Sequence, residues 1–220
     1  AREAIAAACA EQGVPRRLTD VITCEGVRSG LEIVPLAQAV LEVMYSRMAQ
    51  LRELQSVFAP RLKGLAVLAP AQAREFAVGG LVGRASGRSL DVRRREVGMR
   101  LDALRATGSS DGDAAARDAL RLTEIRDSLA LIKRILGSIG MDDDEPAPEA
   151  TQEGIGAAEG ARGDVWYWVR LKNGKIESVH ARDPAVSLLP VLHRVLQGEA
   201  PERLSAGLKS LALAPSGVAM

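Results

Sequence analysis

The sequence predicts a mainly α protein, a long antiparallel helix pair or bundle followed by a small C-terminal α+β hairpin module. Two long stretches carry apolar residues at helical spacing, and a late Asn-Gly pair separates two β-prone runs. The 220 residues fit one large domain or two small ones. Hydrophobic residues make up 47% of the chain but only six are aromatic, so Ala, Leu, Val and Ile must build the core.

The first 60 residues are expected to form two helices. An Ala-rich segment, 1–12, is followed by Gly13, which ends helices readily. A longer helix is expected from Pro35 to Pro60, because proline suits a first turn and is disfavoured in a helix interior. Apolar residues recur on one face of this helix every three to five positions. They are Leu36, Val40, Val43, Met48, Leu51, Leu54 and Phe58.

Two further helices are expected before residue 140. A short one begins at Pro70 and ends before a Gly-Gly pair. A long one covers 111–136, with Asp111 or Ser110 as its N-cap. Its apolar seam steps by three and four residues, a spacing typical of antiparallel helix pairs. The seam residues are Leu122, Ile125, Leu129, Ile132 and Leu136.

A change in composition after residue 140 predicts the domain organisation. Residues 1–140 are the expected helical bundle region, and 141–160 are expected to form an acidic flexible linker, since this range contains prolines and few large apolar residues. Residues 161–220 then form a hairpin plus a C-terminal helical region. The pair Asn173-Gly174 between β-prone runs is the signal for the hairpin.

The charge balance and the few reactive residues argue against several classes of function. The 29 Lys+Arg nearly balance 28 Asp+Glu, so no nucleic-acid partner is expected. Cys9 and Cys24 suit neither a disulfide framework nor a zinc site, and they fit a reducing cytosol. His180 and His193 have no Cys or carboxylate at ligand spacing, so no metal is expected. Without a cofactor fingerprint, a membrane-spanning run or a signal peptide, we expect a cytoplasmic protein with no cofactor.

A local basic patch is the most prominent charged feature. It is either a solvated charge run or a surface that pairs with carboxylates of a partner or of the acidic linker. Its members are Arg84, Arg88, Arg93, Arg94, Arg95 and Arg100. Glycines beside arginines can also bind an anion through backbone N–H groups. The aromatic run 166–168 is expected to pack in the core or in an interface rather than to stack on bases.

Two motifs follow each other along the chain. A Gly-rich R-x-S-G segment precedes an Asp-x-Arg, and the positions are Arg84, Ser86, Gly87, Asp91 and Arg93. The second motif is a Glu-x-x-Arg-Gly-acid turn that leads into the hairpin, and its positions are Glu159, Arg162, Gly163 and Asp164. Pro190 lies within the helix that follows.

In this order, the segments resemble the C-terminal half of the nickel–iron hydrogenase large subunit and of its relative, the 49-kDa subunit of respiratory complex I. The membrane-bound, energy-converting hydrogenases are the most similar type. The resemblance extends from about residue 1 to the C-terminus. It implies the helical fold predicted above, and it makes the motif positions candidate site residues.

One departure from this family bears directly on activity. Active hydrogenases hold nickel and iron with two Cys-x-x-Cys pairs, since soft thiolates suit these metals. Ser216 and Ala219 occupy the positions of the C-terminal pair, and neither Cys9 nor Cys24 belongs to such a pair. The half of the family that carries the other pair is not expected in this chain. The resemblance therefore implies no metal site and no catalytic residue.

Three functions stay open at this point. We favour a non-catalytic hydrogenase-large-subunit-like protein that acts as a structural subunit of a hydrogenase or complex I-like redox complex. The alternatives are a hydrogenase maturation scaffold for the metal cofactor and a quinone-linked redox subunit. The implied partners are an iron–sulfur small subunit, other subunits of such a complex, or maturation proteins. Membrane association is expected only as a peripheral protein, through partners.

Overall fold

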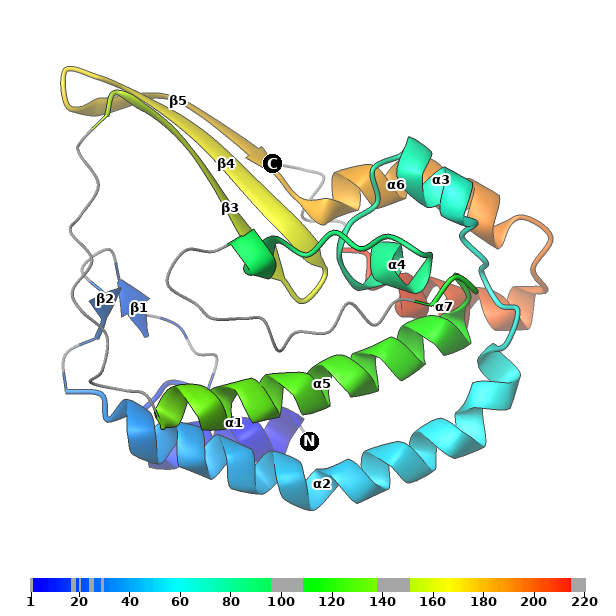
Figure 1. The fold of residues 1–220 in the computed structure, drawn as a ribbon, viewed down its shortest axis with the longest axis horizontal. Helices are drawn as coiled ribbons and strands as arrows, with labels where there is room; N and C mark the ends of the chain where they lie inside the picture. The colour runs from blue at the N-terminus through cyan, green and yellow to red at the C-terminus, as the bar shows by residue number, and fades with distance from the viewer. Residues whose placement is uncertain are drawn as a thin grey trace. The chain divides into compact units, whose positions relative to one another are not determined.

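The computed structural model describes residues 2–16, 19, 21–23, 26–28, 30–95, 109–137 and 151–214. Helices dominate the described part, which also contains a three-stranded antiparallel sheet and a two-stranded ribbon (Figure 1). The mainly α class with a β-hairpin module is therefore confirmed. Packing of the two long helices as a pair stays a prediction, as does the domain division at residues 140 and 160.

The chain divides into two compact units. The first unit comprises Ala1–Ser56 and Ile125–Asp144, and the second comprises Val57–Glu124 and Glu145–Met220. Two long helices, α2 (Ile33–Leu62) and α5 (Ala114–Leu136), therefore contribute to both units. In the described part of the chain, no helix is both long enough and apolar enough to cross a membrane.

The first unit contains α1 and most of α2. Helix α1 covers Arg2–Glu11 and α2 covers Ile33–Leu62, as the sequence predicts to within two or three residues at each end. Between them, β1 (Ile22–Thr23) and β2 (Gly26–Val27) pair antiparallel. Pro60 falls in the last turn of α2, where the helix is about to end. The side chains that α2 buries are Leu41, Met44 and Met48, one turn apart on one face.

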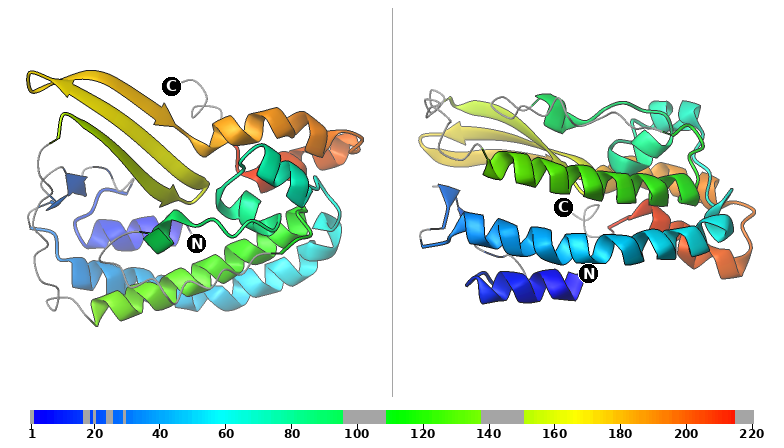
Figure 2. Two further views of the ribbon diagram at one scale, coloured as in Figure 1. Left: turned by 45° about the horizontal axis from the view of Figure 1, so that its top comes forward. Right: turned by 60° about the horizontal axis from the view of Figure 1, so that its bottom comes forward.

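Most helices of the second unit are short. In chain order they are α3 (Pro70–Glu75), α4 (Gly80–Ala85), the 3-10 helix η1 (Val92–Arg95), α5 (Ala114–Leu136), α6 (Pro184–Leu196) and α7 (Pro201–Leu211). Helix α3 ends at Glu75, before the Gly-Gly pair, and the second glycine of that pair is the first residue of α4. Figure 2 shows α3 and α4 joined by a sharp turn.

The N-cap predicted for α5 is wrong. The prediction was Asp111 or Ser110, but the side chain of Asp113 accepts the hydrogen bond from the backbone N–H of Ala116, at 2.7 Å. Gly112 has a positive φ of 64°, which lies outside the right-handed helical region. The helix therefore begins only after this glycine, at Ala114.

The sheet has the order β3-β4-β5 and is antiparallel throughout. Strand β3 covers Glu153–Gly160, β4 covers Gly163–Lys172 and β5 covers Lys175–Arg182. The β4–β5 hairpin turns at Asn173 and Gly174, whose φ angles are both positive, at 52° and 71°. Positive φ at both central residues is what a tight two-residue hairpin turn requires. The predicted hairpin is confirmed.

Part of the predicted linker is a strand instead. We expected 141–160 to be flexible, but β3 pairs with β4 from Glu153 opposite Arg170 to Gly160 opposite Gly163. The strand consists largely of Gly, Ala and Glu, so it lacks the apolar alternation that marks strands in a sequence. Its order comes from hydrogen bonds to β4, which a local pattern does not reveal.

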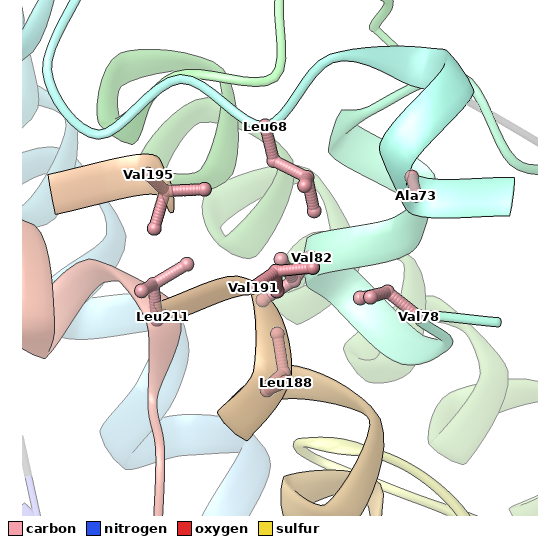
Figure 3. Close-up of a cluster of buried hydrophobic side chains, with 8 residues drawn as sticks. All are labelled: Leu68, Ala73, Val78, Val82, Leu188, Val191, Val195 and Leu211. Carbon is pink, nitrogen blue, oxygen red and sulfur yellow. The ribbon is translucent and has the colours of Figure 1, made fainter. Parts of the chain in front are cut away.

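The main hydrophobic core of the second unit joins α6 and α7 to the segment that contains α3 and α4 (Figure 3). Its buried members are Leu68, Ala73, Val78, Val82, Leu188, Val191, Val195 and Leu211. Three of them lie on α6 at steps of three and four residues, the spacing of one helical face. Fully burying each such aliphatic side chain contributes about 1.5–3 kcal/mol. This core fixes α4, from which the polar site described next begins.

Candidate functional site

Arg84 is the centre of a buried network of charged side chains. It lies on α4, and its residue is only 5% exposed. Its guanidinium donates to Glu124 on α5 at 2.8 Å and to Glu159 on β3 at 2.6 Å. The carboxylate of Asp91 lies 3.8 Å from the same guanidinium. One cation thus holds carboxylates from three segments that are far apart in the sequence.

A second guanidinium completes this network. Arg93 donates to both carboxylate oxygens of Asp91, at 2.9 and 2.7 Å, in the bidentate geometry that arginine favours. Glu159 also accepts from the backbone N–H of Val92, at 3.3 Å. We call Arg84, Asp91, Arg93, Glu124 and Glu159 the Arg84 network.

The charges in the Arg84 network shift each other's proton affinity. Burial alone would raise the pKa of Asp91, but its hydrogen bond with Arg93 and the charges of Arg93 and Arg84 outweigh burial and lower this pKa. The hydrogen bond to Asp91 raises the pKa of Arg93 and outweighs the opposing effect of burial. Both groups therefore stay ionised at neutral pH and hold each other in place.

Close backbone contact brings β3 into reach of Arg84. The turn between β3 and β4 lies directly on the start of α4, where a Cβ on Gly80 would come within 2.3 Å of the Cα of Gly163. A Cβ on Gly79 would come within 2.0 Å of the Asp164 carboxylate. A Cβ at Gly80 would overlap backbone, and one at Gly79 would displace the Asp164 carboxylate, so the Gly-Gly pair allows the approach that places Glu159 beside Arg84.

The structure brings four of the predicted motif positions together, whereas Ser86, Gly87 and Arg162 lie outside this group. Arg84, Asp91, Arg93 and Glu159 belong to the Arg84 network. Ser86 is fully buried and donates to the carbonyl of Val82 at 2.9 Å, which is a structural role.

Gly87 supplies a turn with φ of 81°. Arg162 is exposed and lies outside the network. Ser216 and Ala219 lie outside the described residues, as does Cys24. Their predicted roles stay predictions.

Sequence reasoning missed two members of the polar interior. Glu124 lies between seam residues of α5 in the sequence and did not stand out. A carboxylate beside a buried apolar seam nevertheless indicates a cationic partner. Arg117, on the same helix, is fully buried and donates to the backbone carbonyls of Ala66 and Gly112 and to the hydroxyl of Ser210. Its partners are all uncharged.

Metal ligation has no visible site in the described part of the chain. No three His, Cys, Asp or Glu side chains gather there closely enough to hold a metal ion. His180 instead packs against Trp168, with 5.2 Å between ring centroids.

A solved structure with a similar fold is known. The chain is similar to a chain in the structure of the membrane-bound sulfane sulfur reductase (MBS), described as an archaeal respiratory membrane complex. The TM-score is 0.73 at 23% identity, and the match covers 89% of this chain and 57% of the other. At this level of identity, the likeness establishes a shared fold.

The family follows from the sequence. The model of the family "Respiratory-chain NADH dehydrogenase, 49 Kd subunit" matches residues 1–152, more than half of the chain. The chain therefore belongs to the family of the 49-kDa subunit of respiratory-chain NADH dehydrogenase, and the resemblance predicted from the sequence is confirmed. Glu159 and Arg162 lie beyond the matched range.

Relatives with assigned names agree with this family. The D-type subunit of the NADH-quinone oxidoreductase of Syntrophobacter fumaroxidans is 35% identical over 153 residues, which cover 64% of this chain and 40% of that protein. The C/D-type subunit of the NADH-quinone oxidoreductase of Phocaeicola vulgatus is 30% identical over 175 residues, or 73% of this chain and 33% of that protein. The chain thus spans well under half the length of these relatives.

Proposed function

We propose that this chain is a non-catalytic structural subunit of a complex I-like respiratory complex. Its family and the names of its relatives support membership in such a complex. In this proposal its partners are other subunits of the complex, including an iron–sulfur small subunit, and it reaches the cytoplasmic face of the membrane only through them. The kinship with hydrogenases is part of the same proposal.

An exposed apolar face of the sheet carries this proposal. Tyr167 on β4 is 46% exposed and Val179 on β5 is 49% exposed. Val179 pairs directly with Val169, two residues from Tyr167, so all three share one face of the sheet. On β3 this face carries Gly154 and Gly156, which leave it flat. An exposed, flat apolar surface is typical of a contact with another protein.

The Arg84 network supports the non-catalytic part of the proposal. Its acidic members each accept charge-assisted hydrogen bonds from Arg84 or Arg93, so they serve as structural counter-charges rather than as proton donors or acceptors. The nickel–iron group does not fit this chain, because Ser216 and Ala219 offer no thiolate. We derive no reaction step from that group.

The two alternative functions, a quinone-linked redox subunit and a maturation scaffold, are not equally well supported. A quinone-linked redox subunit is favoured by the names of the relatives, which are quinone oxidoreductase subunits. A maturation scaffold needs an exposed cysteine to handle a metal precursor, and Cys9 is only 2% exposed. This role would therefore depend on Cys24. We rank the maturation scaffold last.

Native purification tests the proposal. The tagged chain is purified from detergent-solubilised membranes of its own host, and the co-purifying proteins are identified by mass spectrometry. We expect stoichiometric recovery of other respiratory-complex subunits, with no nickel and no hydrogen-dependent dye reduction. Recovery of the chain alone, or with maturation proteins, would contradict a subunit role, and stoichiometric nickel with hydrogen oxidation would contradict a non-catalytic one.

Two variants test whether co-purification depends on the apolar face of the sheet. Val179→Lys places a charge on the apolar face and should reduce co-purification about tenfold, whereas Ser178→Lys, one residue away on the opposite face, should not. Circular dichroism confirms that both variants fold. If quinone reduction in membranes falls while the assembled complex stays intact, the redox-subunit alternative replaces our proposal.

A further inference from the structure

A surface pocket of about 450 Å³ lies outside the Arg84 network's interior, beside the loop that joins α4 to η1. Three arginines from separate places line it. Arg74 is in the last turn of α3, Arg88 is in the loop and Arg94 is in η1. Such a concentration of guanidinium groups around one hollow gives a positive local potential that attracts an anion.

The carboxylate in the pocket wall does not neutralise these cations. Asp91 is the acidic residue among the lining side chains, and both its oxygens already accept hydrogen bonds from Arg93. The Asp91–Arg93 pair is internally balanced. Arg74 and Arg88 have no carboxylate partner in the described part of the chain, so their charges add up in the pocket.

The pocket also offers preorganised donors. One guanidinium nitrogen of Arg88 donates to the carbonyl of Val78 at 2.7 Å, which fixes this half-buried side chain and leaves its other N–H groups for a ligand. Arg74 has no ion-pair or hydrogen-bond partner in the described part of the chain. The exposed Ser89 of the pocket wall adds a hydroxyl donor.

We propose that this pocket binds a phosphate group. Arginine is well suited to phosphate because its planar fork donates to two oxygens at once. A phosphate monoester carries close to two negative charges at neutral pH and has three terminal oxygens, so it can use donors from three directions. A carboxylate has one charge and two oxygens, and it would leave part of this donor set unused.

The phosphate can belong to a small soluble compound or to the headgroup of a phospholipid. Both present the same chemistry to Arg74, Arg88 and Arg94. A lipid source would place this face of the second unit against a membrane surface, whereas a soluble source would not. The experiment separates the two sources by its choice of probe.

Binding of inorganic phosphate to the full chain is measured by isothermal titration at low ionic strength. We compare Arg74→Gln with Arg61→Gln, which removes another exposed arginine that also lacks a partner in the described part of the chain. We expect saturable binding that Arg74→Gln weakens about fivefold and Arg61→Gln leaves unchanged. Both substitutions change the net charge equally, so a general charge effect would reduce binding in both.

Flotation with lipid vesicles is the second measurement. Binding to phosphatidic acid vesicles but not to phosphatidylcholine vesicles, lost in Arg74→Gln and kept in Arg61→Gln, would support the pocket with a lipid as the source. Phosphate binding without vesicle binding would support it with a soluble source. The proposal is overturned if neither probe binds, if the two variants weaken binding equally, or if acetate or polyglutamate binds as tightly as phosphate.

Discussion

Two buried arginines in the second unit, Arg84 and Arg117, meet their surroundings in opposite ways. Arg84 is surrounded by carboxylates, and two of them, from Glu124 and Glu159, accept its hydrogen bonds directly. Arg117 is more deeply buried, yet every acceptor it contacts is a carbonyl or a hydroxyl. The same side chain thus serves as a counter-ion in one place and as a connector of backbone segments in the other.

The difference appears in the proton affinity of Arg117. Burial, with a smaller effect from the charge of Arg121, lowers the pKa of Arg117 to about 10, and the charge of Asp113 opposes this only in part. A buried charge without a close counter-charge is destabilising unless hydrogen bonds compensate. The carbonyl oxygens of Ala66 and Gly112 provide this compensation. Removing Arg84 should therefore change the stability of the fold by a different amount from removing Arg117.

The largest effect is expected from Arg84→Met. This change leaves the buried Glu159 without its guanidinium partner, and breaking a buried ion pair in this way costs about 3–5 kcal/mol. Urea unfolding followed by circular dichroism measures the loss. The added change Glu159→Gln should recover part of it, because the uncompensated charge is then gone.

A surface pair provides the control for this prediction. Arg170 contacts Glu153 at 3.3 Å, and both side chains are about half exposed. Arg170→Met should cost no more than about 0.2–1 kcal/mol. If Arg84→Met costs no more than Arg170→Met, the Arg84 network does not stabilise the fold as we describe.

A smaller effect, about 1–3 kcal/mol, is expected from Arg117→Met. The lost hydrogen bonds leave buried carbonyls unsatisfied, but the variant no longer buries a charge. Because the pKa of Arg117 in the folded protein, about 10, lies below its ordinary value, the cost of burying this charge is present at neutral pH and is relieved as the pH rises through 10. The stability of the wild type relative to the variant should therefore increase above pH 10. A constant difference up to pH 11.5 would show that Arg117 does not titrate as described.

Among the substitutions in the polar interior, the smallest effect, about 1 kcal/mol, is expected from Asp91→Asn. The pKa of Asp91 is lowered in the folded protein, so its pair with Arg93 stabilises the fold above the ordinary value of 3.8, and this contribution is lost as the pH falls below it. Urea unfolding between pH 2.5 and 7 should show a stability difference between wild type and variant that is constant above pH 5 and shrinks in acid. A difference that persists at pH 2.5 would contradict the assignment.

The sequence predicted features that depend on local pattern. The helix of Ile33–Leu62 followed from apolar spacing, and the hairpin followed from Asn173 and Gly174. Strand β3 could not be found in this way, because its Gly- and Ala-rich sequence is ordered by pairing with β4. Long-range contacts also decide which polar residues meet.

The same limit applies to the candidate site. The motif pointed to Arg84, Asp91, Arg93 and Glu159, and these residues do lie together. It gave no indication of Glu124, whose sequence separation from Arg84 is 40 residues. It also attributed the same importance to Arg162, which is exposed.

The partners of Arg117 have a consequence for the order in which the chain folds. Arg117 bonds to Ser210, 93 residues away, and the nearby backbone N–H of Ala66 bonds to Glu199, 133 residues away. Contacts of such long range form slowly, because the entropy of closing a large loop must be overcome first. During synthesis, the segment around Ala66 therefore cannot form these native contacts until α6 and α7 have left the ribosome.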